Sequence, residues 1–448
     1  MTVFQQNLKK FILTLFCLFV RNSYNQDQDS PLFKELSEEC WITIVVHGIV
    51  NIKPHLSISN LIRFMRDQIT DSIYARAVEI MRIDPFFFQY SAMQGLGLEK
   101  IDLNRKQAGY ASGAFALSYT HLEHYMSQKT EKNIFYTFGW SGLLSTQIRY
   151  HEAEIFYNAL EKEIKNLREQ GLNPKIRIIG YSHGGYIALN LGAVFNNKKC
   201  NNLDWCVDEL ILLGVPVISD TDFLVESLLF KKIYHIYSPG DRVQVVDCLA
   251  TNRFFSHRIF RSRVGFLLPQ KLTQIQFRVK RIARTRLAQK RCKHHTHHYP
   301  PKLLRNADPG HTELWSFGWS MGYRPYLPLY PFPVGSFIGY LINTIKNNNL
   351  CSNHLIMDIR PFQENIVVSA YDSHLCTTVP FPSQQMLDDL ASQLNPFIPT
   401  DCSRAEYQTK AQHALRIAHA QKKEEWRQKR PCLPRFKKKF CKNPTLVN

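Results

Sequence analysis

The chain has 448 residues, of which 44% are hydrophobic and 21% charged, a composition typical of globular proteins that excludes wholesale disorder. Its 56 Lys and Arg against 37 Asp and Glu give a formal net charge of +19. This excess is confined to two segments: residues 251–306 hold 15 Lys or Arg and no acid, and residues 401–448 hold 13 against four acids. The basicity therefore belongs to one insertion and one tail, and the remaining chain is mildly acidic.

The first 25 residues carry the pattern of a secretory signal. Lys9 and Lys10 precede the apolar run 11–20, and the chain turns polar at Arg21. Such a run is too short to span a bilayer comfortably. We expect residues 1–25 to be a signal-like or membrane-tethering segment of an exported or membrane-associated protein, with a cytoplasmic protein as the alternative.

From Cys40 onward, strand patterns alternate with helix patterns, which predicts an α/β fold with a mainly parallel sheet covered by helices on both faces. The first strand is the run that begins at Trp41, and its continuous apolar character is typical of a strand buried on both faces. Further strands are predicted at 133–138, 175–179, 209–213 and 233–237, and helices at 57–82, 145–170 and 184–195.

The segments outside these elements are expected to have separate roles. Residues 85–129 can form a cap, residues 251–306 are the basic insertion, and the Pro-rich stretch 315–345 is expected to be packed, irregular chain. Two short strand patterns at 355–358 and 366–370 predict a hairpin. We therefore divide the chain into the segment 1–25, a main domain of residues 26–350, and a C-terminal extension of residues 351–448 with the hairpin and the basic tail.

The strongest chemical signal is the string Gly-Tyr-Ser-His-Gly at residues 180–184. It directly follows a predicted strand and directly precedes a predicted helix, which is the context that the G-x-S-x-G motif requires. In such a tight turn the serine adopts a strained conformation, and Gly180 and Gly184 avoid clashes with the neighbouring backbone. Ser182 is therefore our candidate nucleophile; the alternative is an ordinary glycine-rich turn between a strand and a helix.

A serine nucleophile also needs two N–H donors that point at the developing oxyanion, each worth about 3–4 kcal/mol in the transition state. One donor is the amide after the nucleophile, which belongs to His183. The other is expected near Gly48 and Ile49, because the His47-Gly48 dipeptide follows the first strand. The alternative is a loop glycine beside a structural histidine.

With these motifs the stretch from Cys40 to Trp315 resembles an α/β-hydrolase of the lipase or esterase kind. The resemblance rests on the His47-Gly48 dipeptide and on the elbow at residues 180–184. It implies the α/β-hydrolase fold, chemistry without a cofactor, and the chain order nucleophile, acid, histidine.

The resemblance implies that the acid lies in a loop after a later strand. Asp241, in the string Ser-Pro-Gly-Asp-Arg-Val at residues 238–243, follows the strand 233–237 and is the first candidate. Its role would be to accept the Nδ1 proton of the histidine and to stabilise the imidazolium. Asp220 and Asp222, after the preceding strand, are the rivals. A simple turn-forming role for Asp241 stays open.

The histidine must come later still, and His311 is best placed among the 17 histidines of the chain. Gly310 permits a tight loop before it, and the sequence after it resembles the beginning of a helix. His257 and the cluster His294–His298 are the rivals. We expect no metal site at that cluster, because adjacent histidines on a loop cannot all face one ion and no carboxylate lies nearby.

We therefore predict a serine hydrolase that cleaves an ester or related acyl bond through an acyl-enzyme, with lipids among the candidate substrates. The alternative is a catalytically inactive protein of the same fold that serves as a binding or scaffold module on anionic membrane surfaces or nucleic acid. The segments Arg253–Arg305 and Lys422–Lys442 predict an anionic membrane surface as a partner, unless they are merely solvated. We do not expect a nucleic-acid partner, because no helix-turn-helix, RNP or zinc pattern is present. We expect the hydrolase core to work without the basic tail.

Overall fold

The computed structural model of the protein describes residues 38–50, 69–103, 111–126, 132–198, 204–245, 256–282, 304–320, 322–348, 352–372, 375–399 and 404–429. The expected signal-like segment, the first part of the expected 57–82 helix, the His294–His298 cluster and the end of the basic tail lie outside these residues.

The described chain forms an α/β structure around one 11-stranded sheet with the order β11-β10-β9-β7-β6-β5-β4-β1-β3-β2, in which β8 pairs with β7. The seven strands from β9 to β3 in this order are mutually parallel, and antiparallel strands complete both edges. The strands are β1 (Glu38–Val46), β2 (Gly97–Lys100), β3 (Lys132–Gly139), β4 (Leu172–Tyr181), β5 (Val207–Leu213), β6 (Phe230–Tyr237), β7 (Leu272–Ile282), β8 (Leu304–Asn306), β9 (His354–Arg360), β10 (Asn365–Ala370) and β11 (Cys376–Pro380).

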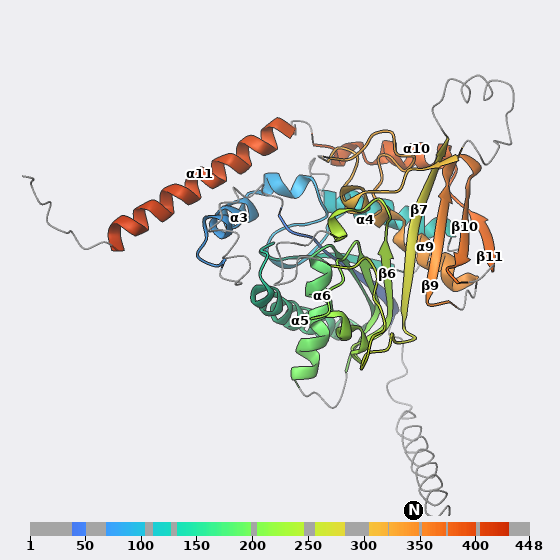
Figure 1. Ribbon diagram of the computed structural model, residues 1–448, viewed down its shortest axis with the longest axis horizontal. Coiled ribbons are helices and arrows are strands. Elements are labelled where there is room, and N and C mark those ends of the chain that lie inside the picture. The colour runs from blue at the N-terminus through green and yellow to red at the C-terminus, as the bar shows by residue number, and fades with distance from the viewer. Residues whose placement is uncertain are drawn as a thin grey trace, which may run out of the picture.

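Helices cover both faces of this sheet. They are α3 (Ile73–Ile83), α4 (Ala111–Met126), α5 (Thr146–Glu169), α6 (Gly184–Asn197), α8 (His311–Trp315), α9 (Ile338–Asn347), α10 (Gln384–Gln393) and α11 (Arg404–Lys429), with short 3₁₀ helices that include η1 (Pro85–Gln89) and η5 (Val334–Phe337). Figure 1 shows α11 projecting from one side of the molecule beside α3, and β9 to β11 at the opposite side.

Side chains of the central strands point alternately to the two faces of the sheet, and each face has its own hydrophobic core. In β1, Ile42 and Ile44 face the core that contains residues of α5 and α6, whereas Val45 faces the core that contains residues of α4 and α9. Because successive side chains of a strand point to opposite faces, a continuous apolar run such as β1 fills both cores at once. The predicted α/β class with a mainly parallel sheet is confirmed.

The order of the strands reverses between β1 and β4. The chain passes from β1 to the edge strand β2, returns to β3 beside β1, and then crosses to β4 on the other side of β1. The parallel register places Val46, the last residue of β1, opposite Gly180 near the end of β4. A crevice opens where the connections of two adjacent parallel strands leave in opposite directions, so this edge is the expected place for a ligand.

Several segments differ from the expectation. Part of the expected basic insertion is the sheet strand β7, which lies between β6 and β9, and β9 to β11 extend the same sheet. The boundary drawn at residue 350 therefore falls inside the sheet. The stretch 315–345 contains the helix α9, and the expected cap at 85–129 contains the edge strand β2 and the buried helix α4. The expected hairpin is present as β9 and β10.

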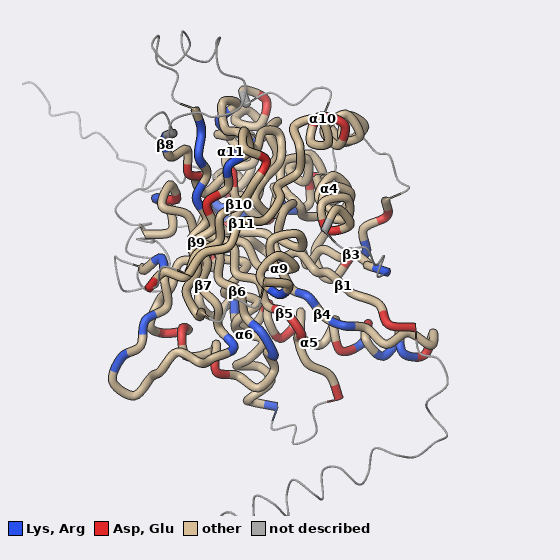
Figure 2. The backbone as a smooth tube through the Cα atoms, turned by 90° about the vertical axis from the view of Figure 1, so that its right-hand side faces the viewer, with Lys and Arg blue, Asp and Glu red and all other residues tan. Residues whose placement is uncertain are grey.

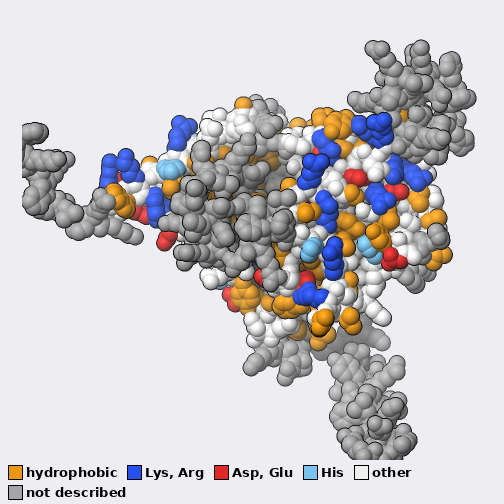
Figure 3. All heavy atoms as spheres, in the orientation of Figure 1, with side chains coloured by type: hydrophobic (Ala, Val, Ile, Leu, Met, Phe, Trp, Pro, Cys, Tyr) orange, Lys and Arg blue, Asp and Glu red, His pale blue; other side chains and the backbone are white. Residues whose placement is uncertain are grey.

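Basic side chains of the expected insertion take part in internal contacts. Arg258 donates to the backbone oxygen of Asp241, Arg263 forms an ion pair with Asp222, and Lys271 donates to the backbone oxygen of Ser227. Figure 2 shows acidic and basic residues mixed along the described chain, and on the face in Figure 3 the Lys and Arg side chains lie between apolar and neutral ones. Part of the basic charge in this segment therefore stabilises the fold.

Within the described residues, none of the helices combines the length and the apolar character that a membrane span needs.

Candidate active site

Ser182 lies at the junction between β4 and α6, where it adopts a left-handed backbone conformation with φ of 52°. This region is costly for a residue with a side chain, and such strain is found mainly where the surrounding structure enforces it. Two close approaches enforce the turn: a β-carbon at Gly180 would lie 2.7 Å from the Cα atom of Gly185, and one at Gly184 would overlap the backbone oxygen of His47.

His311 and Asp241 form one hydrogen-bonded chain with Ser182. The His311 Nε2 atom lies 2.9 Å from the Ser182 Oγ atom, and its Nδ1 atom lies 2.7 Å from Asp241 Oδ2. Asp241 is completely buried, whereas the His311 side chain is 14% exposed. A buried carboxylate on Nδ1 fixes the tautomer that leaves Nε2 free to accept the serine proton.

The loop after β6 holds Asp241 in place. Its Oδ1 atom accepts a hydrogen bond from the Gln244 amide at 3.1 Å, and Arg258 donates twice to its backbone oxygen. Gly240 permits close approach of the loop that carries His311, since a β-carbon there would lie 2.5 Å from the Asp308 backbone oxygen. Two segments separated in sequence are thereby fixed against each other.

The rival residues described by the structure do not take part in the hydrogen bonds that join Ser182, His311 and Asp241. Asp222 forms an ion pair with Arg263, and Asp220 is exposed. His257 forms an isolated bridge with Val217 through backbone atoms. Of these candidates, His311 therefore contacts Ser182 directly, and Asp241 contacts His311.

The predicted donors for an oxyanion surround the same serine. Gly48 is the second residue after the end of β1, and a β-carbon there would lie 3.1 Å from the Ser182 Cβ atom. Ile49 is partly exposed and lines the same pocket, and His183 precedes the first residue of α6. The positive end of the α6 dipole therefore points to the place where negative charge would develop.

His47 is a structural neighbour of this site. Its Nε2 atom accepts a hydrogen bond from the Trp140 amide at 3.2 Å, so its Nδ1–H donates to the Gly48 backbone oxygen at 2.6 Å. Complete burial, and then the nearby Arg82, hold the pKa of His47 well below its ordinary value. A neutral imidazole thus fixes the loop that carries Gly48.

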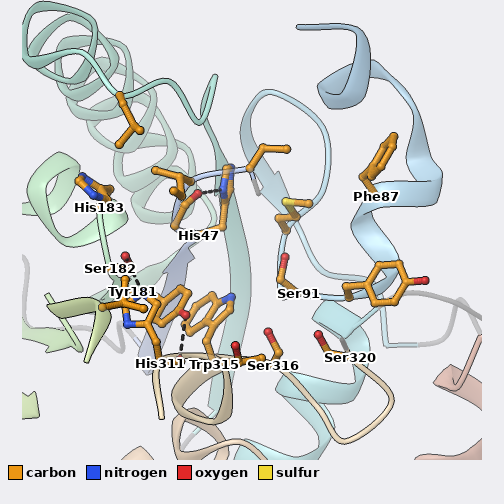
Figure 4. Close-up of a pocket in the computed structure, with 18 of the residues that line it drawn as sticks. His47, Phe87, Ser91, Tyr181, Ser182, His183, His311, Trp315, Ser316 and Ser320 are labelled. Carbon is orange, nitrogen blue, oxygen red and sulfur yellow. Dashed lines mark hydrogen bonds between the residues drawn. The ribbon is translucent and has the colours of Figure 1, made fainter. Parts of the chain in front are cut away.

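A cavity of about 380 Å³ opens beside Ser182. Figure 4 shows Ser182 and His311 at one side of it, Phe87 at the opposite side, and Ser91 between them. Among the described residues its walls contain no Asp, Glu, Lys or Arg; they are formed by His47, Gly48, Ile49, Val50, Phe87, Tyr90, Ser91, Met93, Leu144, Tyr181, Ser182, His183, Pro216, Val243, His311, Thr312, Trp315, Ser316, Ser320 and Tyr407. The volume and the mostly apolar walls are typical of a small-molecule site.

Sequence reasoning missed the residues that support His311. The Tyr181 hydroxyl donates to the His311 backbone oxygen at 2.8 Å, and the two rings lie 4.9 Å apart. Burial, and then Asp241 and Glu313, raise the pKa of Tyr181 well above its ordinary value, which keeps this hydroxyl protonated.

A buried carboxylate holds the loop on the other side of His311. Glu313 accepts from the Gly310 amide at 2.7 Å and from Arg324 Nε at 2.6 Å, and Arg324 also donates to the Asp308 backbone oxygen at 2.8 Å. An acid three residues after a helix-capping position is a recognisable sequence signal. The Arg324 partner carries no such signal.

The C-terminal region also reaches the pocket. Tyr407 of α11 lines it together with Phe87 of η1 and with Tyr90, which directly follows η1. The centre of its ring lies 5.1 Å from that of Phe87 and 5.3 Å from that of Tyr90. The expectation that the core works without the basic tail rests on the positions of the triad candidates alone and stays a prediction; the structure adds that a residue of the tail forms part of the pocket wall.

No group of three or more His, Cys, Asp or Glu side chains that could hold a metal ion occurs in the part of the chain that the structure describes. Comparisons with protein-family models, with curated proteins and with solved structures find no match to this chain.

Proposed function

We propose that this protein is a serine hydrolase of the α/β-hydrolase fold that cleaves an ester or a related acyl bond through an acyl-enzyme. One observation carries the proposal: the hydrogen-bonded chain from Ser182 through His311 to Asp241, with Ser182 in a left-handed conformation between a strand and a helix. The strand order, with its reversal between β1 and β4 beside Ser182, supports the same assignment.

In the first half of the reaction the Ser182 Oγ atom attacks the carbonyl carbon of the substrate while His311 Nε2 takes the hydroxyl proton. The negative charge moves to the carbonyl oxygen, where the amide of His183 and an amide at Gly48 or Ile49 stabilise it. Asp241 stabilises the imidazolium. The tetrahedral intermediate then breaks its bond to the alcohol, which leaves with the proton from His311, and the acyl group remains on Ser182.

In the second half a water molecule loses a proton to His311 Nε2 and attacks the acyl-enzyme. The same donors stabilise the second oxyanion, and the Ser182 oxygen recovers its proton as the carboxylic acid leaves. The whole cycle consumes one ester and one water and yields one acid and one alcohol, so the protein needs no other reactant.

The test is covalent labelling by a fluorophosphonate probe, with mass-spectrometric identification of the labelled peptide. Wild-type protein is expected to be labelled at Ser182, and Ser182→Ala is expected to lose both the label and the hydrolysis of 4-nitrophenyl butyrate. Ser91→Ala is the matched control, because Ser91 lines the same pocket and lies away from His311 (Figure 4); its protein is expected to keep the label.

Absence of labelling in folded wild-type protein would contradict the proposal. It would favour instead the non-catalytic binding module, which keeps the pocket but does not use Ser182 as a nucleophile. Hydrolysis by Ser182→Ala within tenfold of wild type would remove the mechanism as well, since the three residues act as a unit.

A further inference from the structure

The pocket beside Ser182 has a far end built from aromatic rings. Phe87 and Tyr90 meet Tyr407 edge to face, and Figure 4 shows Phe87 across the cavity from Ser182. Tyr407 is 9% exposed, so the wall is closely packed. The space between the serine and this wall is bordered by further apolar residues: Val50, Met93 and Leu144.

The helix that supplies Tyr407 is fixed to the body of the protein over much of its length. The small residues Ala411, Ala414 and Ala418 of α11 belong to the same buried cluster as α3. Lys410 lies 3.4 Å from Asp84 after the end of α3, and Glu425 lies 2.5 Å from Arg76 near its beginning. These two ion pairs show that α3 and α11 run antiparallel. Figure 1 shows the two helices side by side.

The position of η1 is fixed as well. Buried Arg82 lies 5.1 Å from the Phe88 ring centre and donates to the backbone oxygens of Trp140 and Gln94. Lys410 of α11 lies 4.4 Å from the ring centre of Phe86. The aromatic wall thus joins two segments that are more than 300 residues apart in the chain, each held by its own contacts.

We propose that α11 is part of the substrate site and that Tyr407 limits the length of the hydrocarbon chain that the pocket accepts. The inference rests on the proposed function: the substrate class is an uncharged ester whose hydrocarbon chain extends from Ser182 toward Phe87, Tyr90 and Tyr407. Among the described residues, the walls of the pocket contain no Asp, Glu, Lys or Arg. Such walls disfavour a substrate whose hydrocarbon chain carries a charge, because a buried charge needs a partner.

The test compares chain-length profiles of kcat/KM for wild type and Tyr407 variants on two series, 4-nitrophenyl esters of straight-chain acids and butyrate esters of straight-chain alcohols. Tyr407→Ala is expected to move the optimum to longer chains in one series, with a gain of about fourfold for each added methylene that finds room. Tyr407→Trp is expected to move it to shorter chains, and Tyr407→Phe to keep the wild-type profile. The series that responds identifies which side of the ester occupies the pocket.

Leu415→Ala is the matched control, because Leu415 lies on α11 and packs against the same buried cluster but does not line the pocket. Its profile is expected to match wild type even if its melting temperature falls. Unchanged profiles for both Tyr407→Ala and Tyr407→Trp in both series would overturn the inference, as would equal shifts for Leu415→Ala. Loss of probe labelling in the wild type would contradict the proposed function instead, so the two failures are distinguishable.

Discussion

Asp241 and Asp222 are both buried carboxylates, but they face different partners. Asp241 contacts His311, whereas Asp222 forms an ion pair with Arg263. We expect Asp241→Asn to lower kcat by about 10⁴, because an amide in place of the carboxylate leaves the imidazole in the wrong tautomer. The measurement is steady-state hydrolysis of 4-nitrophenyl butyrate.

Asp222→Asn is the matched control for this change. Its expected effect is a lower melting temperature with kcat within a few-fold of wild type, since its partner Arg263 lies on the β6–β7 connection and does not line the pocket. If Asp222→Asn damaged kcat more than Asp241→Asn, the assignment of the acid would be wrong.

Single residues of the site differ in how far the sequence could predict them. Ser182 and Gly48 belong to short motifs that follow strands, so a few adjacent residues are enough to predict their chemical roles. Asp241 and His311 needed the chain order that a family resemblance supplies. The place of Tyr407 in the pocket could not be predicted from the sequence, because only the tertiary packing of α11 brings it there.

At the scale of elements, the short helix α8 shows how a distant side chain can position His311. Arg324 donates to Glu313 within α8 and to the backbone oxygen of Asp308 just before it. We expect Arg324→Ala to lower kcat by about 10- to 100-fold with a smaller change in KM, because a displacement of about 1 Å at the imidazole costs this much. Arg324→Lys is expected to restore part of the rate.

The matched control for this prediction is Arg281→Ala. Arg281 belongs to β7 and lies 5.4 Å from the centre of the Tyr326 ring, which Arg324 also approaches at 5.9 Å. Its substitution is expected to leave kcat near wild type. An equal loss of kcat in both variants would mean that packing on Tyr326, and not the contact with Glu313, positions the loop.

Elements with a strong local pattern were predicted well, and those with mixed signals were not. The helix α5 was expected at 145–170, and it begins after the Ser145 cap, whose side chain accepts from the Ile148 amide at 3.2 Å. In contrast, the strand β7 was not predicted, because its Lys and Arg residues were assigned to a basic insertion. Its buried residues Ile275, Phe277 and Val279 alternate with half-buried polar ones, the pattern of a strand with one solvated face.

At the scale of the whole molecule, the division into a core and an extension could not be derived from composition. The segment after residue 350 is set apart because the family resemblance ends at Trp315 and a basic tail follows it, but strand pairing depends on backbone hydrogen bonds that neither a motif nor composition encodes. β9 pairs in parallel with β7, and β10 and β11 follow it to the sheet edge. The single sheet therefore joins strands from both sides of residue 350 in one folded unit, and α11 packs against α3 in a separate buried cluster.

The folding equilibrium of this unit should depend on pH through two buried histidines. Burial lowers the pKa of His235 from 6.5 to about 4 and holds that of His47 well below its ordinary value. Between about pH 6.5 and pH 4 the unfolded chain therefore binds protons that the folded protein does not. Acidification is expected to lower the free energy of unfolding through this interval, by about 3 kcal/mol from His235 alone, and this loss levels off below about pH 4.

The measurement is urea unfolding at pH 7.5, 6.5, 5.5 and 4.5 for the wild type, His235→Asn and His151→Asn. The quantity compared is the slope of the free energy of unfolding against pH within each variant. The comparison therefore does not depend on how much a substitution changes the free energy of unfolding at pH 7.5. His235→Asn is expected to lose part of the decline, since asparagine does not titrate, whereas His151→Asn, at a histidine whose side chain is 71% exposed, should retain it. If the His235→Asn slope equalled that of wild type, burial of a neutral imidazole at this position would not contribute to the acid sensitivity of the fold. A reduced slope that still falls with acid would leave His47, beside the Gly48 loop, as the next group to substitute.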